Sequence, residues 1–221
     1  MLDFDDHEKN APHDPTTVFL WATTFEIGLG LIALIVGWII GPDARELLPQ
    51  LSNDSVGLLL WQILIGCAAS LPMVALVALL LRLPFEPIRE ITRLSEDDTM
   101  KALLRLTPIE LIVISACAGV GEELLFRGWL LPFLAGGSNV LEQPTIAIGA
   151  SIIGSSILFG LVHPITKLYV VLAGFMGVYF AFLMLATGSL LIPIATHACY
   201  DAIQLLIASR QSRQQPSQIK R

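Results

Sequence analysis

Two adjacent glutamates and an arginine stand inside an otherwise mostly apolar run of the sequence. Glu122 and Glu123 are followed by Arg127, and the surrounding run extends from Pro108 to about Leu134. On a helix, residues four positions apart share a face, so Glu123 can pair with Arg127. Glu122 is rotated by about 100° from Glu123 and points elsewhere. An unpaired carboxylate in apolar surroundings suits a general base or acid. The alternative is an internal salt bridge with a bystander glutamate.

Two histidines lie in later apolar runs. His163 precedes Pro164, and a lone buried histidine is more often a satisfied core residue than a catalyst. His197 and Asp201 are four positions apart, so a helix would turn them the same way. The aspartate can orient the imidazole ring or share ligation of a metal, and a structural His–Asp pair is the alternative. Taken with the glutamates, the histidines predict a base and partners that polarise water and a carbonyl group.

The apolar runs hold a few other reactive or ionisable residues, and we expect their roles to be structural rather than catalytic. Glu26 is the single charge between Val18 and Ile40, and we expect it to reach the membrane interface or to cap a partner. The cysteines lie far apart without CxxC or zinc-ribbon spacing, so neither a disulfide framework nor a cysteine metal site is predicted. We expect them to be small core residues: Cys67, Cys117 and Cys199. HExxH and GxSxG motifs do not occur.

Composition places the chain in a broad class. Of 221 residues, 54% are hydrophobic and only 14% are charged, whereas an average soluble domain carries roughly 25% charged residues. A soluble domain of this composition would expose too much apolar surface, and disorder requires low hydrophobicity. A sequence pI near 5.1 argues against nucleic acid as a partner. The composition therefore predicts a polytopic membrane protein with membrane lipid around it.

The apolar runs predict an all-α transmembrane helical bundle of about six spans, because a spanning helix needs roughly 20 mostly apolar residues. Thr107-Pro108-Ile109-Glu110 forms a capping box that begins the third span. Thr187-Gly188-Ser189 with Pro193 divides the last long run. The charged linker 82–106 is predicted to hold an interfacial helix. The expected spans are 18–40, 56–81, 107–134, 143–166, 168–187 and 190–209.

The placement of Lys and Arg predicts orientation. These residues are concentrated in the linker and in the C-terminal tail, so both termini are expected to be cytoplasmic. The membrane is expected to be the cell membrane. The predicted organisation is an acidic mobile tail (1–16), two spans plus the cytoplasmic linker (17–106), a catalytic helical core (107–209) and a basic tail (210–221).

The candidate residues form three motifs in order. Glu122-Glu123-xxx-Arg127, Phe159-xxx-His163 and His197-xxx-Asp201 resemble the motifs of the CPBP family, the CAAX proteases and bacteriocin-processing (Abi-type) enzymes, over about residues 107–209. The resemblance implies a glutamate-dependent intramembrane endopeptidase that acts on membrane-associated peptides or proteins. It implies that Glu122 and His163 activate water, and that His197 and Asp201 stabilise the oxyanion. Glu123 and Arg127 would support them.

One position departs from the pattern. The prenyl endopeptidases usually have asparagine where this chain has Asp201, and an ionised aspartate cannot donate a hydrogen bond. Asp201 is therefore protonated, or orients His197, or ligates a metal. Glu122 and His163 with these two would also make a plausible zinc set, so a divalent metal is left open. A catalytically silent scaffold or regulator of the same fold is the main alternative. A proton-coupled transporter is a weaker one, since internal repeats are not seen.

Straight spans of equal length would not bring these residues together. Glu122 would lie about 21 Å along the third span. His163 would lie near the cytoplasmic end of the fourth span and His197 near the opposite end of the sixth. Convergence therefore requires short, tilted or broken helices, which protein-buried backbone allows. A separation of more than about 10 Å would remove the catalytic hypothesis.

Overall fold

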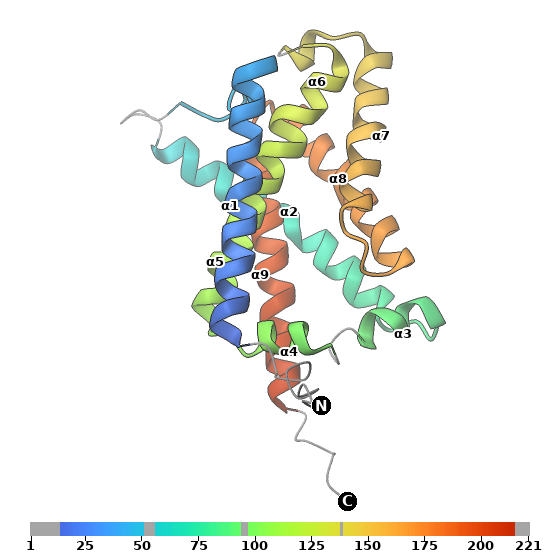
Figure 1. Cartoon of the computed structure of the whole chain (residues 1–221). Coiled ribbons are helices and arrows are strands. Elements are labelled where there is room, and N and C mark those ends of the chain that lie inside the picture. Colours follow the sequence, from blue (N-terminus) through green and yellow to red (C-terminus); the bar gives the residue numbers. More distant parts are fainter. Residues whose placement is uncertain (1–13, 51–55, 94–96, 138, 215–221) are drawn as a thin grey trace, which may run out of the picture.

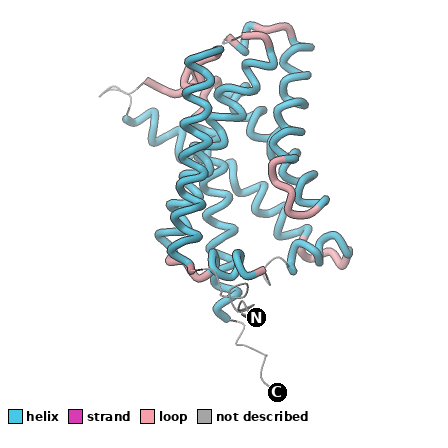
Figure 2. The backbone as a smooth tube through the Cα atoms, viewed as in Figure 1, coloured by secondary structure: helices cyan, strands magenta, loops and turns pink. Residues whose placement is uncertain are grey.

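The computed structural model describes residues 14–50, 56–93, 97–137 and 139–214. Within these ranges the chain is helical and contains no strand (Figures 1 and 2). The predicted all-α class is confirmed. Predictions about the acidic tail before residue 14 and the basic tail after residue 214 lie outside the described residues.

Six apolar helical segments make up the bundle. Four of the helices are long and apolar enough to cross a membrane, and a bent pair beginning at Asp98 would supply a fifth. α7 is a shorter apolar helix of 17 residues. The protein is therefore an integral membrane protein, and the predicted spans correspond to these segments. They are α1 (Pro15–Ile40), α2 (Val56–Leu80), α5 (Pro108–Glu123) continued by the π-helix η4 (Leu124–Leu130) and α6 (Leu131–Ala135), α7 (Thr145–Leu161), α8 (Lys167–Thr187) and α9 (Leu191–Gln214).

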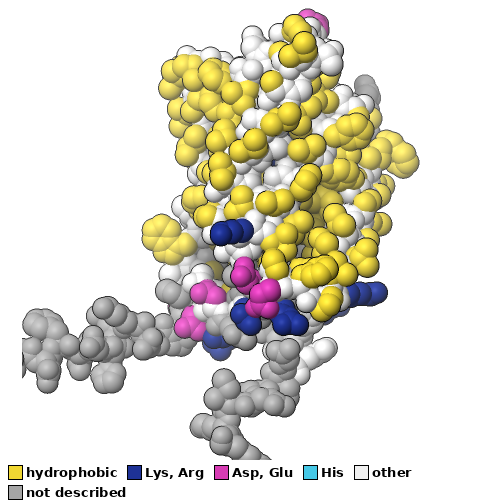
Figure 3. Space-filling model, turned by 90° about the vertical axis from the view of Figure 1, so that its right-hand side faces the viewer, with side chains coloured by type: hydrophobic (Ala, Val, Ile, Leu, Met, Phe, Trp, Pro, Cys, Tyr) yellow, Lys and Arg dark blue, Asp and Glu magenta, His cyan; other side chains and the backbone are white. Residues whose placement is uncertain are grey.

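The charged linker folds as two short helices, α3 (Glu86–Arg93) and α4 (Asp98–Leu104), where one interfacial helix was predicted. The start of α1 and the end of α9 lie at the same end of the molecule as α4 (Figure 1). On the face shown in Figure 3, most of the charged side chains gather at that end, and most of the hydrophobic side chains lie over the rest of the molecule. This division between a charged end and an apolar body matches a bundle with one end in water.

Local sequence signals set several helix ends. Glu110 N–H donates to Thr107 Oγ1 at 3.3 Å, and Thr107 N–H donates to Glu110 Oε2 at 2.7 Å, which confirms the predicted capping box. Gly188 ends α8 in the left-handed conformation at φ 64°, a backbone state that suits glycine. The prediction of a span over 143–166 was wrong at its end, because α7 stops at Leu161. Pro164 disfavours helical backbone in the residue before it, so His163 lies in a loop.

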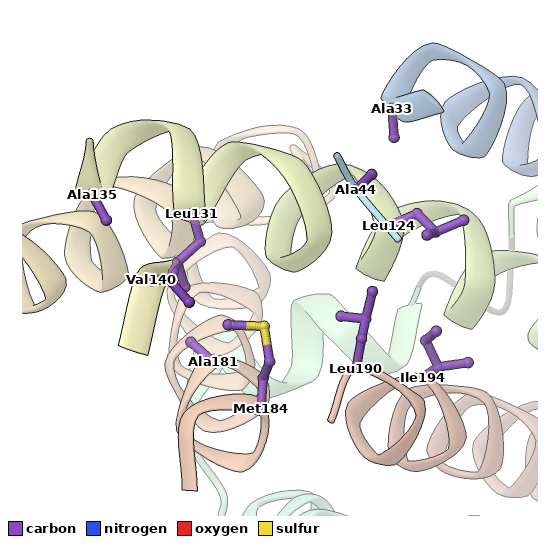
Figure 4. Packing of buried hydrophobic residues seen from close by; sticks show 10 residues of the cluster. All are labelled: Ala33, Ala44, Leu124, Leu131, Ala135, Val140, Ala181, Met184, Leu190 and Ile194. Atoms are coloured by element: carbon purple, nitrogen blue, oxygen red, sulfur yellow. The ribbon is translucent and has the colours of Figure 1, made fainter. Parts of the chain in front are cut away.

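Close packing around α9 holds the bundle together. A Cβ on Gly66 of α2 would lie 2.6 Å from the Ala195 Cβ, and one on Gly119 of α5 would lie 2.8 Å from the Ile194 carbonyl oxygen. Small residues therefore let α2 and α5 approach α9 closely, as is usual between membrane helices. Figure 4 shows the largest buried apolar cluster, which includes Leu124 of η4 beside Ile194 of α9.

The prediction that the cysteines form no disulfide was wrong. Cys67 of α2 and Cys199 of α9 are joined, with their Cα atoms 5.5 Å apart, while Cys117 is free. The two partners are 132 residues apart in sequence. Their contact arises from the packing of α2 on α9, which spacing along the chain does not reveal.

Candidate functional site

The two glutamates end α5, and the π-helix η4 follows them directly. Such segments are frequent at functional sites because they change which side chains share a helix face. The loop after α1 fixes η4 from outside, since Trp129 Nε1–H donates to the Gly41 carbonyl oxygen at 3.0 Å. This contact ties η4, which directly follows Glu122 and Glu123, to the loop after α1.

Glu123 is the centre of a closed ionic cluster. Arg127 Nη1–H donates to Glu123 Oε1 at 3.0 Å, and His197 Nδ1 lies 3.0 Å from the same oxygen. The side chains of Glu123 and Arg127 are 0% exposed. The predicted Glu123–Arg127 pair is therefore present, and the histidine of α9 joins it. Removing one member of such a buried group leaves an uncompensated charge.

Aromatic rings surround the cationic part of this cluster. Arg127 Cζ lies 4.2 Å from the Phe159 ring centroid and 5.3 Å from that of Phe180. Phe180 also stacks on His197, with centroids 4.9 Å apart and an interplanar angle of 14°. Cation–π contact stabilises a guanidinium whose Nε and Nη2 lack hydrogen-bond partners. The sequence did not identify Phe180, because it lies in an apolar run with no spacing relation to the motifs.

Glu122 faces a different histidine. Its Oε2 lies 3.5 Å from His163 Nε2 and accepts no hydrogen bond. His163 Nδ1 lies 2.7 Å from the Phe159 carbonyl oxygen, which can only accept, so Nδ1 carries the proton. The His163 side chain is 22% exposed and that of Glu122 is 9% exposed. This pair is more open than the Glu123–Arg127 pair, whose side chains are 0% exposed.

His197 and Asp201 form the pair that their spacing predicts. His197 Nε2 lies 3.3 Å from Asp201 Oδ2, and the Asp201 side chain is 30% exposed. Both ring nitrogens of His197 thus face carboxylate oxygens, Asp201 on one side and Glu123 on the other. Only the doubly protonated ring donates from both nitrogens. Of the three roles considered for Asp201, this geometry matches the orientation of His197.

Short and broken elements bring the candidates together. α7 ends early and leaves His163 in a loop, while His197 lies two turns into α9. Each histidine contacts one of the two adjacent glutamates, Glu122 or Glu123. The separation that would have removed the catalytic hypothesis is not found, and the catalytic roles stay predictions.

The same side chains are not arranged around a metal position. Among the residues that the structure describes, no group of three or more His, Cys, Asp and Glu could hold a metal ion. His197 directs both nitrogens at carboxylates, which leaves no lone pair for a ligand bond. This arrangement does not fit the zinc set that the sequence left open, and metal assistance stays a prediction.

The expectation for Glu26 was wrong. It lies near the middle of α1 rather than at an end of the helix, and its Oε2 is buried without a hydrogen-bond partner. A Cβ on Gly121 would overlap the backbone carbonyl of Glu26, so Glu26 is next to the residue that precedes Glu122. A lone charge in a long apolar run signalled this position, but the sequence did not show which way it faces.

Comparison with known proteins gave one match. Residues 105–203 match the model of a family described as type II CAAX prenyl endopeptidase Rce1-like. No curated protein matched the chain, and no solved structure did. The matched range contains all six predicted site residues and excludes α1 and α2.

Proposed function

Because residues 105–203 belong to the CPBP family of CAAX-type membrane proteases, we propose that this protein is a glutamate-dependent intramembrane endopeptidase. Its substrates are membrane-associated peptides or proteins of the CAAX type. The observation that carries the proposal is the Glu122–His163 pair, in which Glu122 Oε2 lies 3.5 Å from His163 Nε2 inside an apolar bundle. The neighbouring carboxylate, Glu123, is engaged through its Oε1 atom by both Arg127 and His197.

The chemistry begins with a water molecule held by Glu122 Oε2 and His163 Nε2. Glu122 takes a proton as the water oxygen attacks the carbonyl carbon of the scissile bond, which is general base catalysis. His163 Nε2 accepts a hydrogen bond from the other O–H group of the water and so orients the nucleophile. When the carbon–nitrogen bond breaks, Glu122 returns its proton to the leaving nitrogen. The new carboxylic acid gives up the second water proton to the amine, so the products are a carboxylate and an ammonium group.

The charge that develops on the substrate oxygen needs a fixed donor. His197 Nε2–H supplies it in this proposal, while Asp201 at 3.3 Å and Glu123 at 3.0 Å hold the ring from both sides. A preorganised donor of this kind contributes about 3–4 kcal/mol to transition-state stabilisation. Asp201 is partly exposed and its Oδ2 lies at 3.3 Å, so His197 Nε2–H can be shared between Asp201 and the oxyanion.

We also propose that the charged end of the bundle is cytoplasmic and that the membrane is the cell membrane. The linker helices α3 and α4 lie at that end (Figure 1), and cytoplasmic loops carry an excess of Lys and Arg. The basic residues of the linker are Arg82, Arg89, Arg93, Lys101 and Arg105.

The test is cleavage of a farnesylated peptide with a C-terminal Cys-aliphatic-aliphatic-X sequence by the protein reconstituted in lipid vesicles. Mass spectrometry should show release of the last three residues. Glu122→Gln should lower the rate at least 10²-fold without lowering the unfolding temperature. Undiminished turnover in that variant would contradict the proposal and favour a catalytically silent membrane scaffold.

A further inference from the structure

Tyr169 lies in the first turn of α8, just after the loop that carries His163. Its backbone N–H donates to Thr166 Oγ1 at 3.1 Å, and this bond caps the helix and fixes where it begins. The ring centroids of Tyr169 and His163 lie 6.2 Å apart, with an interplanar angle of 41°. The start of α8 is thus held beside the histidine that faces Glu122.

The side chain of Tyr169 belongs to the inward face of α8. Residues four, seven and eleven positions apart share one helix face, and here they are Tyr169, Ala173, Met176 and Phe180. Ala173 is 4% exposed and Phe180 is 0% exposed, and all four pack in one cluster with Phe159. Tyr169 is the member of this face at the His163 end of the helix. Its ring therefore points into the bundle and toward the site.

The hydroxyl group of Tyr169 is a free donor at the edge of the site. Among the described residues it has no hydrogen-bond partner. It is also not enclosed by protein, whereas other unpartnered oxygens, such as Glu26 Oε2 and Ser156 Oγ, are buried. Because Tyr169 is only half-buried, its O–H group is open to a molecule bound beside His163.

The donors of the two histidines already have acceptors. His163 Nδ1–H faces a backbone carbonyl oxygen at 2.7 Å, and the two nitrogens of His197 face Glu123 and Asp201. The unpartnered nitrogens of Arg127 belong to a side chain that is 0% exposed. An oxyanion at this site would therefore share its one histidine donor with a carboxylate. A tyrosine hydroxyl is among the groups that stabilise such developing charge.

We propose that Tyr169 is a further catalytic residue, whose O–H donates a hydrogen bond to the scissile carbonyl oxygen as that oxygen gains negative charge. The inference rests on the proposed function and adds a second donor beside His197 Nε2–H. The carbonyl carbon must approach the water held by His163, and the Tyr169 ring lies beside that histidine. No covalent bond to Tyr169 forms or breaks, and the hydroxyl keeps its proton throughout.

The first test measures kcat and KM of Tyr169→Phe on the farnesylated peptide in vesicles. Loss of one oxyanion donor should lower kcat about 10²-fold. KM should stay within about threefold, because the contact strengthens only in the transition state. The unfolding temperature should not fall, since the hydroxyl has no partner to lose.

Tyr179→Phe is the matched control on the same helix. It removes a hydroxyl that donates to the Ala69 carbonyl oxygen at 2.9 Å. This variant should lower the unfolding temperature, because a hydrogen bond between α8 and α2 is lost, while kcat should not change. The two substitutions thus separate a catalytic hydroxyl from a structural one.

The second test compares two ligands in the Glu122→Gln background, where cleavage does not interfere. One is the farnesylated peptide, and the other is the same peptide with a phosphinate in place of the scissile amide, which presents a charged oxygen in tetrahedral geometry. Tyr169→Phe should weaken phosphinate binding about tenfold or more, and leave binding of the peptide unchanged. A purely structural Tyr169 would weaken both equally.

Unchanged kcat in Tyr169→Phe, or equal losses of affinity for the two ligands, would overturn the inference and leave the proposed function standing. Absence of cleavage by the unmodified protein would overturn the proposed function, and this inference with it.

Discussion

Glu122 and Glu123 are adjacent copies of one side chain in very different surroundings. Glu123 is 0% exposed and has Arg127 and His197 each at 3.0 Å. Glu122 has His163 at 3.5 Å and an oxygen that accepts no hydrogen bond. The two identical side chains therefore differ in the partners that surround them. One carboxylate is a fixed charge in the core and the other is free to take a proton.

The partners come from different kinds of element. Arg127 lies in η4 and His197 in α9, so the surroundings of Glu123 are built entirely from helices. His163 lies in the loop after α7, which can adjust around water and substrate more easily than packed helices. The helices around Glu123 thus position Glu122 and its more adjustable partner His163, because a single peptide bond joins the two glutamates.

The largest expected effect is on stability. Glu123→Gln should lower the free energy of unfolding by about 3–5 kcal/mol, because Arg127 and His197 would remain buried without their shared carboxylate. Glu122→Gln, the matched control, should change it by less than about 1 kcal/mol, since no hydrogen bond is lost. Thermal unfolding in detergent, followed by helical circular dichroism, measures both. Equal losses in the two variants would break the distinction between the glutamates.

A smaller loss of stability is expected at the aromatic rings that pack against Arg127 and His197. Phe180→Leu removes the ring that stacks on His197 and lies 5.3 Å from Arg127 Cζ. It should lower the free energy of unfolding by about 2 kcal/mol. The same unfolding experiment checks this, with Phe182→Leu as control, because Phe182 is an exposed phenylalanine of the same helix. Equal effects at the two positions would show that the cation–π contact adds nothing.

The smallest effect concerns the position that departs from the family pattern. Asp201→Asn should keep turnover within about tenfold, because the amide oxygen can still accept from His197 Nε2–H. Asp201→Ala removes the acceptor and should cost more. Initial rates on the farnesylated peptide decide between them. A loss beyond about 10²-fold in Asp201→Asn would show that the charge of Asp201, and not its orientation of the ring, matters.

Local geometry explains what the sequence predicts correctly. The Glu123–Arg127 and His197–Asp201 pairs follow from four-residue spacing on a helix, and the Thr107 box fixes the start of α5. The contacts of His197 with Glu123 and of His163 with Glu122 join residues far apart in the chain. No local pattern determines these contacts.

The remaining errors have the same origin. α7 ends before His163 because Pro164 restricts the backbone of the residue before it. The predicted span 143–166 relied on apolar content and did not take this proline into account. The Cys67–Cys199 contact, the burial of Glu26 Oε2 and the stacking of Phe180 all depend on how helices pack. Spacing along one helix carries no information about which face a distant helix covers.

The central claim is that Glu122 and His163 act as one unit on one water molecule. The direct measurement is a double-mutant cycle on kcat with Glu122→Gln, His163→Gln and the double variant in vesicles. Each single substitution should lower kcat about 10²-fold or more. The double variant should be no slower than the worse single variant, because residues that act as a unit are not additive. Losses that multiply in the double variant would contradict the account.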